Sequence, residues 1–269
     1  GKGGSSRRKK LFPDYKQNRS VKKNATKIEF ATVEDEYESM RKQMMRIVQY
    51  LSLLPVQILC IDNIEADDTI AYLTMQYFGP KGSKIRIVST DRDFLQLVSE
   101  NVEVYSPVKK KIYQPKDLFE EFGIHPDNYL LYRIVDGDTG DNIPGVNGIG
   151  LKTLTKHFPE ISEKPITFDH LLTESELKVD EKRAPKIYQI LLDYRKELER
   201  NFDLMQLQEI DIALSIKIKI INLIEQQVPK IDKMKFRKFI IEDYLTDQFK
   251  NLDNWLLMTF NSLNAASHE

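Results

Sequence analysis

Three short acidic clusters contain the side chains of this chain that are best suited to chemistry. They are Glu65-Ala66-Asp67-Asp68, Asp91-Arg92-Asp93 and Asp138-x-x-Asp141. Each has an ordinary explanation by itself, because Asp caps helices, favours the helix macrodipole and is common beside Gly in turns. Crowding many carboxylates together, however, costs free energy unless a cation balances them. The three clusters together therefore predict a shared cation site.

The ligand types indicate which cation this site would hold. Oxygen-only clusters suit hard ions, which favours Mg²⁺ or Mn²⁺ over Zn²⁺. The scattered histidines are better explained as structural or exposed residues; they are His125, His157, His170 and His268. Two such ions about 4 Å apart are the usual arrangement for in-line displacement at a phosphodiester. The clusters therefore predict a metal-dependent nuclease.

A glycine-rich turn follows the third cluster. Gly145, Gly148 and Gly150 permit positive φ and leave backbone N–H groups open at the start of the next helix, where they can bind phosphate. Lys152 adds positive charge. Such a turn contacts no base edges, so the sequence predicts nucleic-acid binding that is indifferent to base sequence.

Charge is unevenly distributed along the 269 residues, although the net charge is only -1. Residues 1–27 contain ten Lys or Arg residues and one acidic residue, Asp14. A solvated tail is one explanation. Phe12 and Tyr15 lie among these charges, and this mixture favours contact with nucleic acid, where bases stack and phosphates pair.

The composition excludes several other classes of protein. No apolar run is long enough to span a bilayer, and no secretory pattern is present. The single cysteine, Cys60, rules out an internal disulfide framework. We therefore expect an intracellular protein with no membrane partner.

The elements that must position the acidic clusters alternate between strand and helix. A capping box at Thr32 begins an amphipathic helix with Tyr37, Met40, Met44, Ile47 and Leu51 at helical spacing. Strands are expected at 56–61, 84–89 and 102–105, with helices at 66–78 and 94–98. This alternation predicts an α/β fold with a parallel sheet covered by helices on both faces. The acidic clusters would then lie beyond the carboxyl ends of the strands.

From residue 115 onward the pattern is mostly helical. Helices are expected at 115–122, 126–135, 151–157, 185–201 and 233–251. Residues 210–224 contain a Lys alternation that suits a strand, although a helix is also possible.

Four blocks of the sequence resemble the 5'-nuclease family, which includes bacteriophage 5'-3' exonucleases, the 5'-nuclease domain of bacterial DNA polymerase I and the flap endonucleases. The blocks are Phe12-Pro13-Asp14-Tyr15-Lys16-Gln17-Asn18-Arg19, Glu65 to Asp68, Ser89-Thr90-Asp91-Arg92-Asp93-Phe94, and Gly137 to Lys152. Their order and spacing match the family to about residue 160. The resemblance implies a PIN-like 5'-nuclease core followed by a helical helix-three-turn-helix DNA-binding region.

The resemblance also implies roles for individual residues. One metal ion would be served by Glu65, Asp67 and Asp68, and the second by Asp91, Asp93, Asp138 and Asp141.

Lys16 and Arg19 would lie at the base of a helical arch formed by about residues 20–50 and would offset charge on the scissile phosphate. Tyr15 would stack on a base near that bond. The glycine turn would grip duplex DNA and bind K⁺, through Gly145, Gly148, Gly150 and Lys152.

The function implied is that of a structure-specific 5'-3' exonuclease or flap endonuclease acting by a two-metal mechanism in primer removal or repair. Its substrate would be DNA with a 5' flap, nick or branch, or an RNA–DNA hybrid, in the cytoplasm of a bacterial cell or phage-infected host. The domain division expected is a nuclease core with the arch at 1–135 and the DNA-binding region with carboxy-terminal helices at 136–269.

Two alternatives remain open from the sequence. Family members carry a strand with a metal-ligand Asp, and a second Asp in a Phe-Asp-Gly type motif, ahead of the segment that opens this sequence. We therefore expect a separate amino-terminal piece or replication proteins as partners. The first alternative is a catalytically impaired DNA-junction binding protein, and the second is a toxin-like ribonuclease of the related PIN fold.

Overall fold

The computed structural model describes residues 3–18, 30–229 and 231–266, without the side chains of 264–266, and it divides into two compact units. Unit 1 comprises Gly1–Lys23 and Asp62–Ile212, and unit 2 comprises Asn24–Ile61 and Ala213–Glu269. This division differs from the expected boundary after residue 135. The physical reason is that the glycine turn and the helices after it share one buried core with the residues before them.

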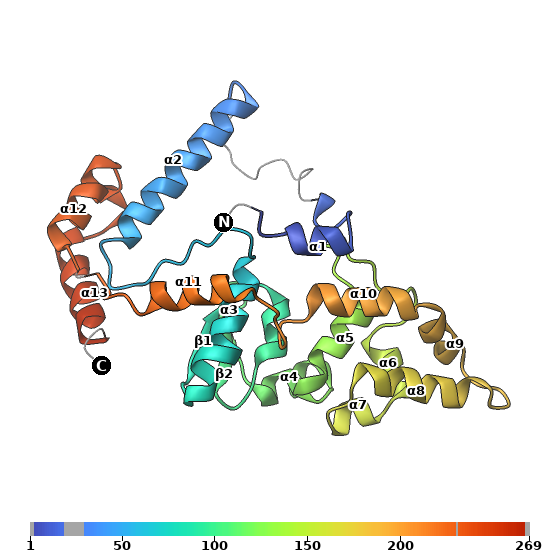
Figure 1. The fold of residues 1–269 in the computed structure, drawn as a ribbon. Helices are drawn as coiled ribbons and strands as arrows, with labels where there is room; N and C mark the ends of the chain where they lie inside the picture. The colour runs from blue at the N-terminus through green and yellow to red at the C-terminus, as the bar shows by residue number, and fades with distance from the viewer. Residues whose placement is uncertain (1–2, 19–29, 230, 267–269) are drawn as a thin grey trace. The chain divides into compact units, whose positions relative to one another are not determined.

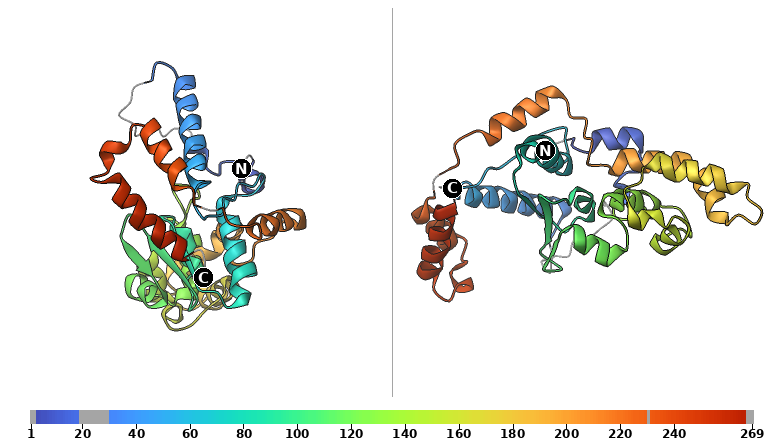
Figure 2. Two further views of the ribbon diagram at one scale, coloured as in Figure 1. Left: turned by 90° about the vertical axis from the view of Figure 1, so that its left-hand side faces the viewer. Right: turned by 90° about the horizontal axis from the view of Figure 1, so that it is seen from below.

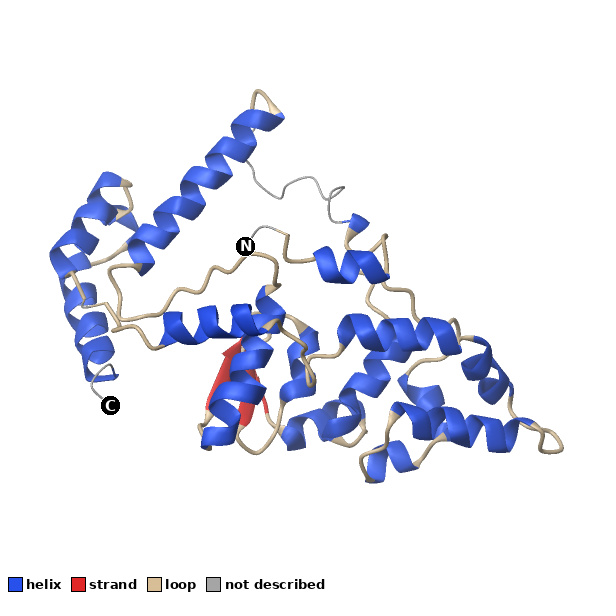
Figure 3. Cartoon of the chain, viewed as in Figure 1, coloured by secondary structure: helices blue, strands red, loops and turns tan. Residues whose placement is uncertain are grey.

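The sheet of unit 1 has three strands, β1 (Ile85–Val88), β2 (Val102–Ser106) and β3 (Lys111–Tyr113). Figure 3 colours the strands red. β1 and β2 are parallel, with Ile85 opposite Val102. β3 pairs with β2 in the antiparallel direction through a tight turn in which Lys110 has a φ of 51°. The α/β class is confirmed, and the sheet is mixed where a parallel one was expected.

The strand expected at 56–61 is not formed in the described part of the chain. An apolar run fixes only a preference for burial, whereas a strand also needs a neighbour for its backbone hydrogen bonds. The Val56 N–H at the start of this segment donates to the Leu54 carbonyl, two residues earlier, and not to a neighbouring strand.

Helices make up most of unit 1 (Figure 1). The α-helices are α1 (Ser6–Leu11), α3 (Ala66–Tyr72), α4 (Pro115–Phe122), α5 (Tyr129–Asp136), α6 (Leu151–His157), α7 (Glu160–Glu163), α8 (Phe168–Val179), α9 (Lys186–Asp193) and α10 (Arg195–Met205). The shorter helical segments are η2 (Leu73–Phe78), η3 (Gly79–Lys81), η4 (Arg92–Leu97) and η5 (Pro126–Asn128). The expected helices at 115–122 and 151–157 are confirmed, and 185–201 is divided between α9 and α10.

The core of unit 1 joins α5, the glycine turn and the helices from α6 to α10. Its fully buried members include Ile134, Leu154, Leu171 and Leu198. Each such side chain contributes about 1.5–3 kcal/mol relative to an exposed one. This core holds α5 and α10 against each other and so fixes the turn that carries the third acidic cluster.

Unit 2 contains α2 (Val33–Leu51), α11 (Leu214–Ile224), α12 (Lys233–Glu242), η6 (Thr246–Gln248) and α13 (Leu252–Ala266). α2 begins at Thr32 in the expected capping box. The segment with the Lys alternation is helical, as α11, and the helix expected at 233–251 ends earlier, at Glu242. Figure 2 shows α12 beside α13, and their small core consists of Leu53, Phe236, Ile240, Leu256 and Phe260.

None of the helices formed by the described residues has the length and apolar character needed to cross a membrane.

Candidate active site

All three acidic clusters lie in unit 1, at the ends of its elements. Glu65 is the N-cap residue of α3, and Asp67 and Asp68 occupy the first turn of that helix. Asp91 caps η4, where its carboxylate accepts a hydrogen bond from the Asp93 N–H at 2.9 Å. Asp138 and Asp141 follow α5 in the glycine turn. The second cluster comes after the carboxyl end of β1, as the sequence predicted.

Arg8 of α1 lies among the residues of the first cluster. Its guanidinium donates to Glu65 at 2.5 Å and to both oxygens of Asp68 at 2.6 and 2.9 Å, and its Nε donates to the Leu204 carbonyl at 2.8 Å. Burial opposes the charge on Arg8, but Asp68 more than compensates and raises the pKa of the guanidinium above its usual range. The sequence reading missed Arg8 because it stands in a basic run that resembles a solvated tail.

Lys16 bridges the first and third clusters. Its ammonium pairs with Glu65 Oε1 and lies 3.7 Å from Asp141 Oδ2, and its backbone N–H donates to the Asp141 carbonyl at 2.9 Å. Lys16 has a φ of 59°, a left-handed conformation that is strained for a residue with a Cβ and that recurs at functional sites. The structure thus places this expected catalytic residue at the carboxylates.

Tyr15 is positioned differently from the expectation that it stacks on a base. Its side chain is only 3 % exposed, and its hydroxyl lies 3.1 Å from Asp141 Oδ2 and 3.3 Å from Glu65 Oε2. A base cannot reach the face of a ring that is packed in the core, so in this conformation Tyr15 orients carboxylates. Arg19, the other expected arch residue, lies outside the described residues.

Arg133 of α5 joins the second and third clusters. Its Nη2 lies 3.0 Å from Asp93 Oδ1 and 2.7 Å from Asp138 Oδ2, and its Nη1 donates to the Gly137 carbonyl at 2.9 Å. The side chain is 1 % exposed. The sequence reading missed this residue as well, although an Arg within the apolar run from Leu130 to Val135 was the available signal.

The remaining carboxylates repel one another. Burial, followed by the charge of Asp91, raises the pKa of Asp67. Burial also raises the pKa of Asp93 to about 6, with further contributions from Asp91 and Asp138, and Arg133 only partly offsets these effects. For Glu65 the balance is reversed, because Lys16 and Arg8 outweigh burial and lower its pKa. The repulsion therefore concentrates on the edge formed by Asp67, Asp91 and Asp93.

These charges test whether the residues suit a metal ion. Seven carboxylates from the three clusters face three cations, Arg8, Lys16 and Arg133, which leaves an excess of negative charge. Neither Asp67 nor Asp91 has an ion pair with another described residue. Within the described ranges, no group of three or more His, Cys, Asp or Glu side chains is already arranged around a metal position. The oxygen donors and the net charge thus suit hard divalent ions, and the side chains must shift to coordinate them.

The glycine turn is held by close backbone contacts. The Asp138 N–H donates to the Ile143 carbonyl, and the Ile143 N–H donates back, both at 2.8 Å. A Cβ added at Gly145 would lie 2.2 Å from the Asp136 carbonyl oxygen, whereas one added at Gly150 would meet nothing within 4 Å.

The expected phosphate-binding residues of this turn therefore have different positions. Gly145 is required for close packing, and Gly148 has a φ of 78° with open space around it. Gly150 is the N-cap residue of α6, and Lys152 is exposed in the first turn of that helix. Gly148 and Lys152 are exposed, and Gly148 and Gly150 have open space where a side chain would stand.

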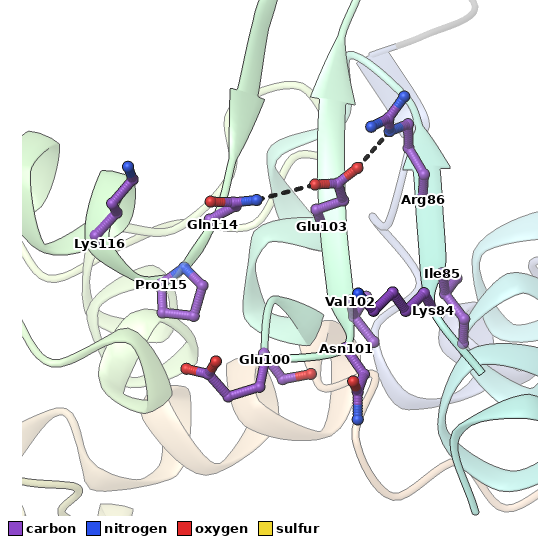
Figure 4. Close-up of a pocket in the computed structure, with 11 residues that line it drawn as sticks. Lys84, Ile85, Arg86, Glu100, Asn101, Val102, Glu103, Gln114, Pro115 and Lys116 are labelled. Atoms are coloured by element: carbon purple, nitrogen blue, oxygen red, sulfur yellow. Dashed lines mark hydrogen bonds and ion pairs between the residues drawn. The ribbon is translucent and has the colours of Figure 1, made fainter. Parts of the chain in front are cut away.

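A cavity of about 680 Å³ in unit 1 lies away from these residues (Figure 4). It is lined by Lys84 and Val102, at the amino-terminal ends of β1 and β2, and by Glu103, which binds Arg86 and Gln114. The acidic clusters line a much smaller hollow, whose walls include Arg8, Tyr15, Asp67, Asp93 and Asp141. Residues from all three clusters and from the basic segment therefore meet in one place.

Comparisons with known proteins agree with this arrangement. Residues 2–123 match the family model described as 5'-3' exonuclease, N-terminal resolvase-like domain. The chain is 30 % identical over 240 residues to a 5'-3' exonuclease of Aquifex aeolicus, covering 87 % of this chain and 73 % of that protein. It is 35 % identical over 134 residues to the thermostable DNA polymerase I of Thermus thermophilus, covering 50 % of this chain and 16 % of the polymerase.

Solved structures show the same fold. A flap endonuclease of bacteriophage T5 in complex with DNA and metal ions superposes with a TM-score of 0.59 at 24 % identity, covering 90 % of this chain and 80 % of that chain. A T5 5'-exonuclease with bound zinc ions superposes with a TM-score of 0.58, also at 24 % identity, covering 90 % of this chain and 81 % of that chain.

Proposed function

This chain belongs to the 5'-3' exonuclease family, and from that premise we propose that it is a structure-specific nuclease that cuts phosphodiesters where a 5' single strand meets duplex DNA. Members of this family are nuclease enzymes, and the finer assignment covers both 5'-3' exonuclease and flap endonuclease activity. The observation that carries it is the run of mutually repelling carboxylates Asp67, Asp91 and Asp93 beside Lys16.

Two Mg²⁺ ions are the proposed cofactors, and Mn²⁺ would substitute for them. When bound, such a pair polarises the phosphoryl oxygens and supplies an activated water. The ligands proposed are Asp67, Asp91, Asp93, Asp138 and Asp141. Arg8 donates hydrogen bonds to one oxygen of Glu65 and to both oxygens of Asp68. Glu65 and Asp68 would therefore bind a metal ion only after these bonds to Arg8 are broken.

Lys16 has the proposed task of neutralising the scissile phosphate. Its ammonium already lies beside Glu65 and Asp141, so a phosphate bound at that edge would lie within its reach. Once the carboxylates turn toward metal ions, Lys16 is released to pair with phosphate oxygens. Arg19 has the same proposed role.

The glycine turn is proposed to hold the duplex part of the substrate. The accessible N–H groups near Gly148 and Gly150, together with Lys152, would contact phosphates and no base edges. K⁺ at the turn is part of the same proposal. The proposed substrates are DNA with a 5' flap, nick or branch and RNA annealed to DNA, and the proposed role is primer removal or repair.

The test is cleavage of a 5'-labelled flap duplex with Mg²⁺, with an EDTA control and a parallel binding measurement. We expect a short labelled product that depends on the metal. Lys16→Ala should lower the cleavage rate by about 10²-fold with little change in binding. Lys84→Ala, an exposed change beside the amino-terminal end of β1, is the matched control. An equal loss of rate and affinity in Lys16→Ala would reduce Lys16 to a phosphate contact.

A second function is favoured by the ion pairs of Arg8, Lys16 and Arg133 with the expected ligands. A protein with its carboxylates neutralised in this way could bind DNA junctions without cutting them. Binding of the flap with no product at any Mg²⁺ or Mn²⁺ concentration would establish that function in place of the nuclease.

A further inference from the structure

A mostly apolar pocket of about 330 Å³ lies between α5, α8 and α10 of unit 1. Leu130, Leu131 and Ile134 of α5 line it, and each is at most 6 % exposed. Phe168 of α8 and Phe202 of α10 line it as well, and their rings stack with centroids 6.3 Å apart. A volume of this size suits a small molecule or the anchoring side chains of a peptide.

The pocket is separate from the candidate active site. It shares no lining residue with the small hollow that the acidic clusters line. None of its lining residues is a proposed metal ligand, and none belongs to the glycine turn. The proposed nuclease function therefore leaves this pocket without a role.

Two uncompensated carboxylates border the pocket, and no basic side chain of the described residues lines it. Asp169 is exposed in the first turn of α8 and has no ion pair with another described residue. Asp127 is exposed too, and Nδ1 of His125 lies 3.8 Å from its Oδ2. The same Nδ1 accepts a hydrogen bond from the Asp127 backbone N–H at 3.3 Å, so it carries no proton and does not neutralise the carboxylate.

These features select the chemistry of the occupant. The two carboxylates would repel the phosphates of a nucleic acid, so DNA is not the expected ligand. The apolar interior favours an apolar side chain, whose burial displaces water from Leu131 and from the two phenylalanine rings. The carboxylates and the faces of the rings both attract cations beside that side chain. A basic peptide with an apolar anchor meets both requirements.

We propose that the pocket binds a short segment of a partner protein in which a leucine or phenylalanine anchor is flanked by lysine or arginine. The anchor enters between α5 and the Phe168–Phe202 pair, and the flanking cations pair with Asp127 and Asp169. Peptide segments of this kind bind through a few buried anchors. The inference rests on unit 1 alone and does not depend on the nuclease assignment.

Fluorescence polarisation tests the proposal with a fluorescein-labelled peptide that carries a Leu-Phe pair between two Lys-Arg pairs. Titration with the full chain at low salt should give saturable binding. Replacing Leu-Phe by Ala-Ala should weaken binding about 10-fold or more, because the apolar contact is lost. Replacing the basic residues by Gln should weaken binding about 3–10-fold, because the ion pairs at the rim are lost.

Variants of the chain locate the binding. Asp127→Asn combined with Asp169→Asn should weaken binding of the basic peptide about 3–10-fold and should leave binding of the Gln peptide unchanged. Phe202→Ala should weaken binding of both peptides. Asp180→Asn, exposed at the C-cap of α8 and outside the pocket, is the matched control and should bind as the parent does. Thermal melting followed by far-UV circular dichroism confirms that each variant is folded.

Flap DNA provides a second control. Excess flap duplex should not displace the peptide, because the pocket shares no residue with the acidic clusters or the glycine turn. The combined Asp127→Asn and Asp169→Asn variant should also keep the flap cleavage rate of the parent.

The proposal fails if the peptide shows no saturable binding up to about 0.3 mM protein, if the Ala-Ala peptide binds equally well, or if the combined Asn variant keeps full affinity for the basic peptide. Displacement of the peptide by flap DNA would place it on the nucleic-acid surface and would also overturn the proposal. If Phe202→Ala weakens binding of single-stranded DNA and not of the peptide, the pocket takes a base.

Discussion

At the scale of single residues, the least expected feature is a buried arginine between two proposed metal ligands. Arg133 holds Asp93 and Asp138, which come from segments 45 residues apart in the chain (93 and 138). A guanidinium in this position keeps the carboxylates close together when no metal is bound. Its removal would leave both charges without compensation.

We therefore expect Arg133→Gln to lower the free energy of unfolding by about 3–5 kcal/mol. Urea unfolding of the metal-free protein measures this loss. Arg92→Gln, an exposed neighbour of the same cluster, serves as the control and should cost less than about 1 kcal/mol. A loss in Arg133→Gln as small as that of the control would show that the buried pair is not needed for folding.

Asp67 leads to the opposite expectation. Burial and Asp91 raise its pKa, so its charged form is disfavoured in the folded, metal-free protein. A raised carboxyl pKa means that stability is greatest at low pH and falls as pH rises through the folded pKa. At pH 7.5, Asp67→Asn should therefore raise the melting temperature while it lowers flap cleavage by about 10²-fold or more.

Calorimetry of the metal-free variant at pH 7.5 and pH 4 tests this expectation. The gain in melting temperature should be smaller at pH 4 than at pH 7.5, because burial, followed by the charge of Asp91, raises the pKa of Asp67 and favours its protonation as the pH falls. Asp14→Asn, an exposed carboxylate, should change neither temperature nor cleavage. If Asp67→Asn is less stable than the parent protein at pH 7.5, the charged form of Asp67 is stabilised by its surroundings, and this expectation is wrong.

At the scale of elements, different glycines of the glycine turn are needed for packing and for the proposed binding of DNA. Gly145→Ala places a methyl group against the Asp136 carbonyl, so it should cost about 2 kcal/mol or more in unfolding free energy. Gly150→Ala has open space and should leave stability within about 0.5 kcal/mol, whereas its methyl group at the N-cap of α6 should weaken duplex binding by hindering the approach of a phosphate. Denaturant melts and flap binding compare the two. Equal stability in both variants would contradict the close approach at Gly145.

The junction of α2 with α12 should be sensitive to acid. Hydrogen bonding to Arg46 lowers the pKa of Asp243 despite partial burial. Stability from a lowered carboxyl pKa is complete above the unfolded value, about 4, and is lost as pH falls through the folded value. Arg46→Ala should lower the free energy of unfolding by about 0.5–1 kcal/mol at pH 7. The variant should also lack the part of the acid-induced loss of stability that comes from protonation of Asp243.

Urea unfolding followed at Trp255, which packs against Phe249 in the same unit, measures this effect at pH 7 and pH 3. Lys42→Ala, at an exposed residue that pairs with Glu38 of the same helix, is the control. If acidification lowers the free energy of unfolding equally in the parent protein and in Arg46→Ala, protonation of Asp243 does not cause the acid sensitivity.

The elements with local signals could be predicted from the sequence. α4 has Pro115 at its first position and Gly123 in the left-handed conformation after its end, and both signals are visible in the sequence. β3 and the unpaired segment 56–61 could not be predicted, because a strand depends on a distant partner.

The same distinction holds for the candidate site. The carboxylates of Asp67, Asp91 and Asp138 stand in recognisable clusters, so their types indicated their chemistry. Arg8 and Arg133 find their partners 60 and 40 residues away, and no local pattern distinguishes such a residue from a solvated one.

At the scale of the whole molecule, the two units have cores of different extent. The single tryptophan, Trp255, lies in unit 2, whereas most of the ordered helix and the whole sheet lie in unit 1. The small core of unit 2 should melt first. The Trp255 fluorescence transition should therefore precede the far-UV circular dichroism transition by several degrees. Coincident transitions would show that the chain unfolds as one cooperative unit.

The contact between Arg8 and the Leu204 carbonyl also governs when the site can form. It closes a loop of 196 residues, while the ribosome adds about 5–20 residues per second. Arg8 is thus synthesised about 10–40 s before Leu204. During that interval the Nε of Arg8 lacks its acceptor, the Leu204 carbonyl. A nascent chain stopped short of α10 lacks the anchor for Arg8, so the proposed cutting centre is completed only late in synthesis.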